Sequence, residues 1–154
     1  MKKLLILLLL CTLCGCAAHA PSLADTVTAT LADKSLPAGR LLCYGRGTDG
    51  TLTREIIFDY LGLAGYPDFT EKIEEMAVFS TLAGEFGEVC VLRLYDHDDL
   101  ADAKALLSRR ITAAARALAV FGKSPPPSAL CSRGNTVALV MLPDPDPLAE
   151  LLLK

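Results

Sequence analysis

Hydrophobic and polar positions follow the most regular pattern in the second half of the chain. Residues 74–82 and 88–95 are apolar, β-branched or aromatic runs, and the glycine-containing segment 83–87 separates them. Runs of this length and composition predict a β-hairpin. Because side chains alternate across a strand, the second run has two faces. One carries Cys90, Leu92 and Leu94, and the other carries Val89, Val91, Arg93 and Tyr95.

A helical period follows this hairpin. Apolar residues recur at helical spacing from about Asp98 to Val120, and acidic residues occupy the first turn, where they complement the helix dipole. Three consecutive prolines at 125–127 end this segment. Residues 129–132 and 136–142 flank Arg133-Gly134-Asn135 and predict a second hairpin. The tail, residues 144–153, predicts a terminal helix.

The first half of the chain is less regular. Residues 25–34 predict a short helix, and residues 40–44 are ambiguous between strand and loop. The segment 45–50 contains three glycines but matches neither a dinucleotide-binding fingerprint nor a Walker sequence, so it predicts a turn. Thr51 or Thr53 is positioned to cap a following helix through Leu61, which Gly62 ends.

This order of elements predicts the fold class. Two strands, a long helix and two more strands form a four-stranded antiparallel sheet in ββαββ order, with the long helix packed on one face and short N-terminal helices beside it. The class is α+β. In this arrangement the second sheet face stays open to solvent, and Arg93 and Tyr95 lie on it, which makes that face the candidate surface for a partner.

The first sixteen residues have the features of an export signal. Lys2 and Lys3 precede an apolar run that is too short to span a bilayer, and Leu13-Cys14-Gly15-Cys16 is typical of a lipobox. We therefore expect a lipoprotein signal peptide at 1–15, a lipidated tether at 16–24 and one domain at 25–154. Cys16 is the expected acceptor of acyl chains such as palmitate, which would hold the protein on the extracytoplasmic face of the cell membrane. The alternative is secretion after a cut near residues 18–20.

Charge and cysteine content narrow the function classes. Without residues 1–15 the chain keeps 13 basic and 18 acidic residues, a net charge near −5. Nucleic acid is excluded as a partner class because its binding requires a basic face. The domain keeps three cysteines, Cys43, Cys90 and Cys131. One disulfide with one free thiol and three buried thiols both agree with that odd number.

Several segments together resemble a known family. They are the lipobox, the weak N-terminal helices, residues 71–78 (EKIEEMAV), Gly87-Glu88-Val89, residues 98–110 and residues 134–139 (GNTVAL). In this pattern the chain is similar to the clostridial lipoproteins grouped as domain of unknown function 4358. The resemblance implies a Firmicute surface lipoprotein, and an accessory role beside membrane O-acyltransferases that modify an envelope polymer. It implies no catalytic residue and no cofactor.

The densest polar cluster is Tyr95-Asp96-His97-Asp98-Asp99. One histidine among three carboxylates suits a divalent cation, whereas the same residues at the start of a helix serve as its cap and first turn, which we favour. Ser108, Ser132 and Thr136 lack a nucleophile motif. The carboxylates of Glu74 and Glu75, and of Glu85 and Glu88, could flank a sugar but are typical of surface charge. The candidate partner or ligand residues are Arg93, Tyr95, His97, Arg109 and Arg110.

Three functions remain after this comparison. The leading hypothesis is a tethered, non-enzymatic accessory or binding module that contacts membrane lipid through Cys16 and docks on a membrane protein or an envelope polymer. A solute-binding lipoprotein is disfavoured, because one domain does not supply two lobes around a cleft. The alternative is a small surface enzyme, or a metal-dependent ligand-binding protein, that uses residues 96–99.

Overall fold

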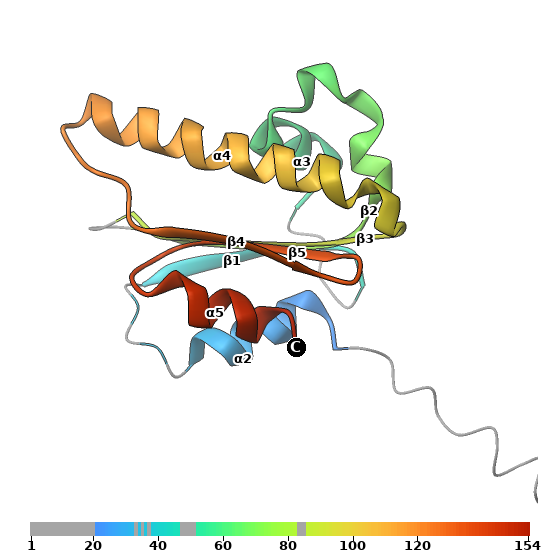
Figure 1. The fold of residues 1–154 in the computed structure, drawn as a ribbon, viewed down its shortest axis with the longest axis horizontal. Helices are drawn as coiled ribbons and strands as arrows, with labels where there is room; N and C mark the ends of the chain where they lie inside the picture. The colour runs from blue at the N-terminus through green and yellow to red at the C-terminus, as the bar shows by residue number, and fades with distance from the viewer. Residues whose placement is uncertain (1–20, 33, 35, 37, 47–51, 83–85) are drawn as a thin grey trace, which may run out of the picture.

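An antiparallel sheet of five strands lies between two layers of helices (Figure 1). The structure is a computed structural model that describes residues 21–154 except 33, 35, 37, 47–51 and 83–85. The helices are α2 (Leu23–Ala32), α3 (Arg54–Leu61), α4 (Leu100–Val120) and α5 (Pro145–Leu152), with short 3-10 helices η1 (Leu63–Gly65), η2 (Pro67–Lys72) and η3 (His97–Asp99). The strands are β1 (Gly39–Tyr44), β2 (Ile73–Thr81), β3 (Glu88–Leu94), β4 (Ser128–Arg133) and β5 (Thr136–Met141).

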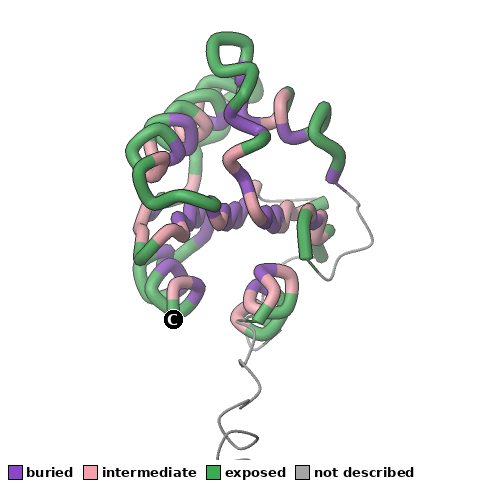
Figure 2. Tube along the Cα trace, turned by 90° about the vertical axis from the view of Figure 1, so that its right-hand side faces the viewer, coloured by how far each residue is buried: buried purple, intermediate pink, exposed green. Residues whose placement is uncertain are grey.

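The strand order is β1-β2-β3-β5-β4, which places β3 at the centre. The α+β class and the two hairpins are confirmed, and so are the two faces of β3. Cys90, Leu92 and Leu94 belong to one hydrophobic core, while Val89 and Val91 belong to the other. Figure 2 shows the sheet as a band of buried residues between the two layers.

The first core lies between the sheet and the layer made by α3, α4 and the 3-10 segments that follow α3. Helix α4 packs on the sheet through Ala103, Leu106, Leu107 and Ala114, whose spacing puts them on one side of the helix. Helix α3 begins at the predicted cap: the Thr53 hydroxyl accepts a hydrogen bond from the N–H of Ile56. It ends where Gly62 adopts φ 64°, a left-handed conformation that favours glycine.

The second core lies between the sheet and helices α2 and α5, and on this side the predicted architecture is wrong in two respects. The sheet has five strands, not four, because residues 39–44 form β1 and pair antiparallel with residues 76–81 of β2. The second face is not open, because α2 and α5 cover it. Leu23 and Val27 of α2 and Leu148 and Leu152 of α5 are at most 4% exposed there. The open sheet face expected for partner contact therefore does not exist.

Element boundaries differ from the predicted ones by a few residues. Helix α2 starts at Leu23, inside the segment expected to be tether, and α4 is preceded by the 3-10 turn His97–Asp99. The remainder of the expected tether, the predicted signal peptide and Cys16 lie outside the described residues, and so does most of the glycine-rich segment 45–50.

A β-bulge near the start of β2 determines which way its first side chains point. Ile73 pairs with Leu94 and Glu75 pairs with Arg93, so β2 contributes one residue more than β3 between these two pairs. The extra residue shifts the alternation of side chains. Ile73 consequently joins the α4-side core, whereas Glu75 points to the α2 side, where the cross-strand side chain is Arg93.

Candidate functional site

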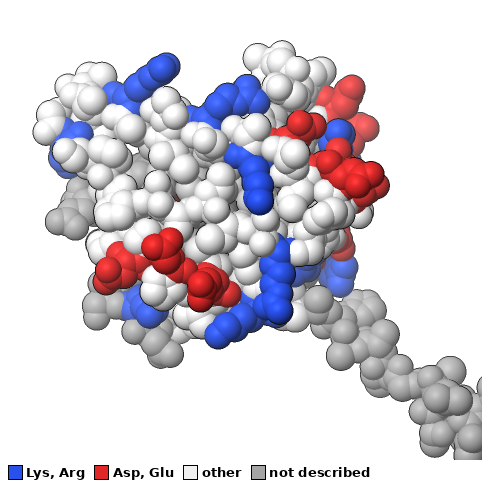
Figure 3. All heavy atoms as spheres, viewed as in Figure 1, with Lys and Arg blue, Asp and Glu red and all other residues white. Residues whose placement is uncertain are grey.

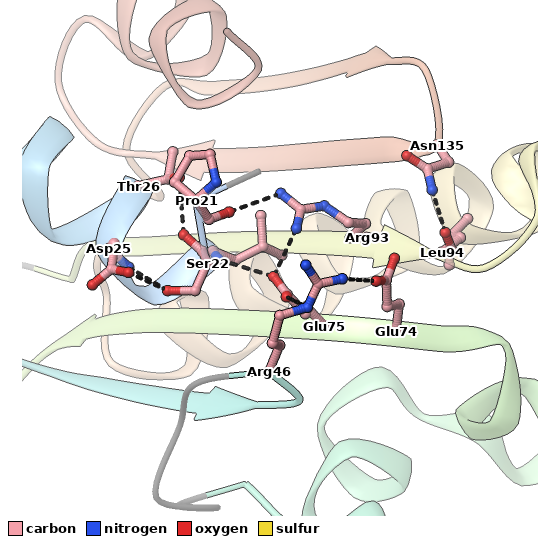
Figure 4. Close-up of polar contacts among 11 residues, drawn as sticks. Pro21, Ser22, Asp25, Thr26, Arg46, Glu74, Glu75, Arg93, Leu94 and Asn135 are labelled. Carbon is pink, nitrogen blue, oxygen red and sulfur yellow. Dashed lines mark hydrogen bonds and ion pairs between the residues drawn. The ribbon is translucent and has the colours of Figure 1, made fainter. Parts of the chain in front are cut away.

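Four segments that are distant in the sequence meet at the end of the sheet where the described chain begins (Figures 1 and 4). They are the residues leading into α2, the bulged start of β2, the end of β3 and the turn between β4 and β5. We call this region the tether end.

Glu75 is at the centre of the tether end and is 1% exposed. Its Oε2 accepts hydrogen bonds from the backbone N–H of Leu23, at 3.0 Å, and from Nη1 of Arg93, at 2.9 Å. Its Oε1 has no hydrogen-bond partner among the described residues but lies 3.5 Å from Nε of Arg46. Arg46 also pairs with Glu74 at 2.6 Å, so two arginines face two glutamates (Figure 4).

These contacts fasten the start of the domain to the sheet. A buried carboxylate is costly unless it is paired and hydrogen-bonded, so the position of Arg93 and the N-terminus of α2 depend on Glu75. Arg93 also donates from Nη2 to the backbone oxygen of Pro21, at 3.4 Å. Ser22 adds a local cap, because its hydroxyl accepts from the N–H of Asp25 and donates to the Asp25 carboxylate. The chain is thus held in place from Pro21 onward.

A pocket of about 270 Å³ opens beside Arg93. Thr26 of α2, the β4–β5 turn and the last residues of the chain contribute to its walls. The lining residues are Pro21, Leu23, Thr26, Arg93, Arg133, Asn135, Thr136, Leu152, Leu153 and Lys154. Three of them are basic and none is acidic.

The other buried carboxylate, Glu88, lies on the opposite face of the sheet beneath α4. It is 1% exposed and accepts three hydrogen bonds, from the Tyr60 hydroxyl at 2.6 Å and from Nε and Nη2 of Arg110 at 3.1 and 2.6 Å. The Arg110 guanidinium also stacks over the Tyr60 ring, 4.6 Å from its centroid. The pairing with Glu88 raises the pKa of Arg110 above its ordinary value. With all its contacts satisfied, this cluster joins α3, α4 and β3.

The structure separates the five residues predicted to form a partner surface. Arg93, Tyr95 and His97 lie at or next to the tether end, and Tyr95 is 69% exposed. Arg109 lies on α4 with its guanidinium 5.0 Å from the centroid of Tyr66. Arg110 is bound to buried Glu88. Arg93 and Arg110 therefore act on opposite faces of the sheet.

Residues 96–99 contact backbone groups and Lys72. An Asp96 carboxylate oxygen accepts from the N–H of Asp98 at 2.9 Å, and Asp99 pairs with Lys72 at 2.6 Å. His97 Nδ1 lies 2.8 Å from the backbone oxygen of Gly134. No group of three metal-binding side chains occurs in the part of the chain that the structure describes.

No disulfide joins Cys43, Cys90 and Cys131. Cys90 is completely buried, and burial raises the pKa of its thiol well above the ordinary value. A thiol in this state is a poor nucleophile. Cys90 is therefore a core residue, as its apolar neighbours predict.

The sequence pattern did not predict that Glu75 and Glu88 are buried, because glutamates of this spacing are typical of surface charge. A signal was present for Glu88, which precedes Cys90, Leu92 and Leu94 at the spacing of one strand face. No such signal exists for Glu75, whose orientation depends on the bulge. Glu75 and Glu88 face opposite sides of the sheet, so they do not act as a pair.

Comparison with known proteins adds no identity to this geometry: the chain matches no protein-family model, no curated protein and no solved structure. Among the described residues, no helix is long and apolar enough to cross a membrane. The contacts of the tether end are therefore the main guide to function.

Proposed function

We propose that the chain is a lipoprotein anchored through Cys16 to the extracytoplasmic face of the cell membrane. In this proposal it acts as a non-enzymatic accessory or binding module for a membrane complex that modifies the cell envelope. The lipobox and the resemblance to the clostridial lipoprotein family support the anchor. The observation that carries the proposal is the attachment of Pro21 and Leu23 to Arg93 and buried Glu75.

This attachment limits how far the domain can move from a lipidated Cys16. Pro21 follows Cys16 by five residues, and a fully extended chain of that length spans at most about 18 Å. The domain would therefore lie close to the bilayer with its tether end toward the lipid. A short tether and a firm attachment suit a module that works in one orientation.

The opposite end of the domain carries exposed apolar side chains. Helix α4 runs away from the tether end, and its last residue, Val120, is 81% exposed (Figure 1). Phe121, which follows, is 77% exposed, and Leu82 at the far end of β2 is 68% exposed. We call these three residues the apolar tip. In this proposal the apolar tip is where the extracytoplasmic part of a membrane protein would dock.

Cross-linking in intact cells followed by mass spectrometry tests this function. Wild-type protein should capture a discrete membrane protein, and Cys16→Ala protein, released from the membrane, should not. Labelling with a palmitate analogue checks the anchor separately, since only the wild type should incorporate it. If lipidated wild type captures no partner, the accessory function is wrong even though the anchor is right.

Two single substitutions locate the contact. Phe121→Asp places a charge on the apolar tip, and Tyr95→Asp does the same to an exposed aromatic residue beside the tether end, 69% exposed. We expect Phe121→Asp to reduce cross-linking at least fivefold and Tyr95→Asp to leave it within twofold of wild type. The reverse result would move the contact to the tether end.

A further inference from the structure

We propose that the pocket beside Arg93 binds the phosphate of an anionic phospholipid headgroup. The inference rests on the proposed anchoring to a membrane, because that orientation brings this pocket to the lipid surface. It adds a direct contact between the folded domain and the bilayer, separate from the acyl chains on Cys16.

The donors in the pocket suit a phosphate group. Arg93 uses two of its five N–H groups to contact Glu75 and Pro21, which leaves donors for a ligand. Arg133 is exposed and pairs with no carboxylate of the residues that the structure describes. Thr136 also lines the pocket. Guanidinium groups bind phosphate oxygens through two parallel hydrogen bonds, which adds geometric specificity to the charge.

The charge balance of the pocket depends on Arg133. The positive charge of Arg93 is offset by Glu75, which lies behind it. Lys154 contributes the ammonium group of its side chain. Glu150 lines an adjoining hollow with Arg133 and Lys154 but does not line this pocket. Among the described residues that line the pocket, Arg133 therefore carries a positive charge that no acidic side chain of the wall offsets.

The position of the pocket identifies the source of the phosphate. Pro21, the first described residue, is part of the pocket wall, and the anchor residue is five positions earlier. Lys and Arg side chains gather at this end of the molecule, next to the start of the described chain (Figure 3). An acidic domain is repelled by an anionic membrane, so a basic pocket at the end nearest the bilayer counters that repulsion.

The experiment uses full-length protein in micelles of a neutral detergent. The chain contains no tryptophan, so Tyr95→Trp supplies a single tryptophan, two residues after Arg93, which lines the pocket. Phosphatidylglycerol is titrated into the micelles, with phosphatidylcholine and aqueous inorganic phosphate as separate arms. We expect a saturable change in emission with phosphatidylglycerol and none with phosphatidylcholine.

The variant Arg133→Glu, in the Tyr95→Trp background, should raise the half-saturating fraction of phosphatidylglycerol at least tenfold. Arg116→Glu is the matched control, because it makes the same change of charge at an exposed position of α4 on the other side of the sheet, and it should change the value less than twofold. Equal responses of the two variants would overturn the proposal. Saturation by inorganic phosphate with no response to phosphatidylglycerol would also overturn it, since the site would then bind a soluble anion.

The titration does not depend on the acyl chains, so it separates this inference from the proposed function. Cys16→Ala protein in the same micelles should bind phosphatidylglycerol as wild type does. If palmitate labelling fails but the titration succeeds, the pocket is a lipid site in a protein that is not a lipoprotein. If labelling succeeds and the titration fails, the anchor stands and the pocket is not a headgroup site.

Discussion

Each face of the sheet buries one carboxylate, and an arginine from a neighbouring segment balances each of them. Glu88 receives three hydrogen bonds, whereas one oxygen of Glu75 has only the ion pair with Arg46 at 3.5 Å. A buried ion pair adds little net stability, but removing one partner leaves an uncompensated charge and is strongly destabilising. The two glutamates therefore make their elements sensitive to single changes in the arginines.

Adjacent arginines on α4 provide a matched test of this sensitivity. Arg110→Met removes the partner of buried Glu88, and we expect a loss of about 3 kcal/mol in the free energy of unfolding. Arg109→Met removes only an exposed stacking contact with Tyr66, so the expected loss is about 0.5 kcal/mol. Urea denaturation followed by circular dichroism measures both. Similar losses in the two variants would mean that the Glu88 pair is not a special structural contact.

The same cluster predicts a decrease of stability in alkaline solution. Burial raises the pKa of the Cys90 thiol and of the Tyr60 hydroxyl, and the negative charge of Glu88 adds to both shifts. Above pH 9 for the thiol and above pH 10 for the phenol, the ordinary pKa values of these groups, the unfolded chain loses protons that the native state retains. More protons are then bound in the native state, so the free energy of unfolding falls as pH rises, by about 1.4 kcal/mol per pH unit for each group.

Urea denaturation at pH values from 8 to 11 measures this slope. The double variant Tyr60→Phe/Cys90→Ala carries neither titrating group, so its stability should be lower at pH 8 but should fall less steeply above pH 9. A slope equal to that of the wild type would mean that Tyr60 and Cys90 do not cause the alkaline loss of stability. Comparing the slopes instead of the absolute stabilities separates the effect of titration from the stability that the variant loses through altered packing.

At the scale of single residues, the sequence predicts faces better than partners. The alternation in β3 was sufficient to place Cys90, Leu92 and Leu94 on one side. The partner of Glu88 could not be found in this way, because Arg110 lies 22 residues away and reaches it only once α4 packs on the sheet. Pairing of buried charges is a tertiary property, so local patterns do not contain it.

At the scale of elements, the boundaries that could be predicted are those with local chemical causes. Thr53 and Gly62 delimit α3 through a side-chain cap and a left-handed residue, and both act within one turn. Strand β1 has no such local signal, because it depends on pairing with β2 more than thirty residues later. The bulge that turns Glu75 toward α2 is likewise set by the register between strands.

The two glycines after α3 test the role of the left-handed terminus. Gly62→Ala forces a side chain into φ 64°, although no atom obstructs it, and should cost about 1 kcal/mol in the free energy of unfolding. Gly65→Ala meets nothing within 4 Å and has no such backbone constraint, so its effect should be neutral or slightly stabilising. Thermal denaturation compares the two. Equal destabilisation would show that the conformation of Gly62 is not what ends the helix.

The attachment of α2 gives another prediction at this scale. Glu75→Gln keeps the shape of the side chain but weakens its bonds to Arg93 and to the N–H of Leu23. We expect amide hydrogen exchange in α2 to accelerate at least tenfold, while exchange in α4, on the other face, stays within twofold. Glu74→Gln, on a carboxylate bound by exposed Arg46, is the control and should change neither helix. Uniform acceleration across the domain would indicate global destabilisation in place of release of α2.

At the scale of the whole molecule, covering both sheet faces moves the candidate contacts to the two ends of the domain. The tether end is polar, basic in its pocket and closely attached to the start of the chain, whereas the apolar tip carries exposed side chains. The sequence pattern predicts short helices at both ends of the chain but not the sheet face on which they pack. The second face was therefore expected to be open, whereas α2 and α5 cover it. The two ends of the domain therefore differ, and under the proposed anchoring through Cys16 this difference would orient the domain at the membrane.

Lengthening the tether tests whether this orientation matters. Ten Gly and Ser residues inserted after Ala18 would let the domain rise by up to about 35 Å while Cys16 keeps its acyl chains. A flexible linker also lowers the effective concentration of the domain at any fixed height. We therefore expect palmitate labelling and membrane fractionation to stay unchanged while cross-linking to the membrane partner falls at least threefold.

An insertion of the same length after Lys123, in the connection beyond α4, is not a suitable control, because it would disturb the apolar tip itself. Appending the same ten residues after Lys154 is the matched control, and it should leave cross-linking unchanged. If the variants extended after Ala18 and after Lys154 both cross-link as the wild type does, docking does not depend on the height of the domain above the bilayer.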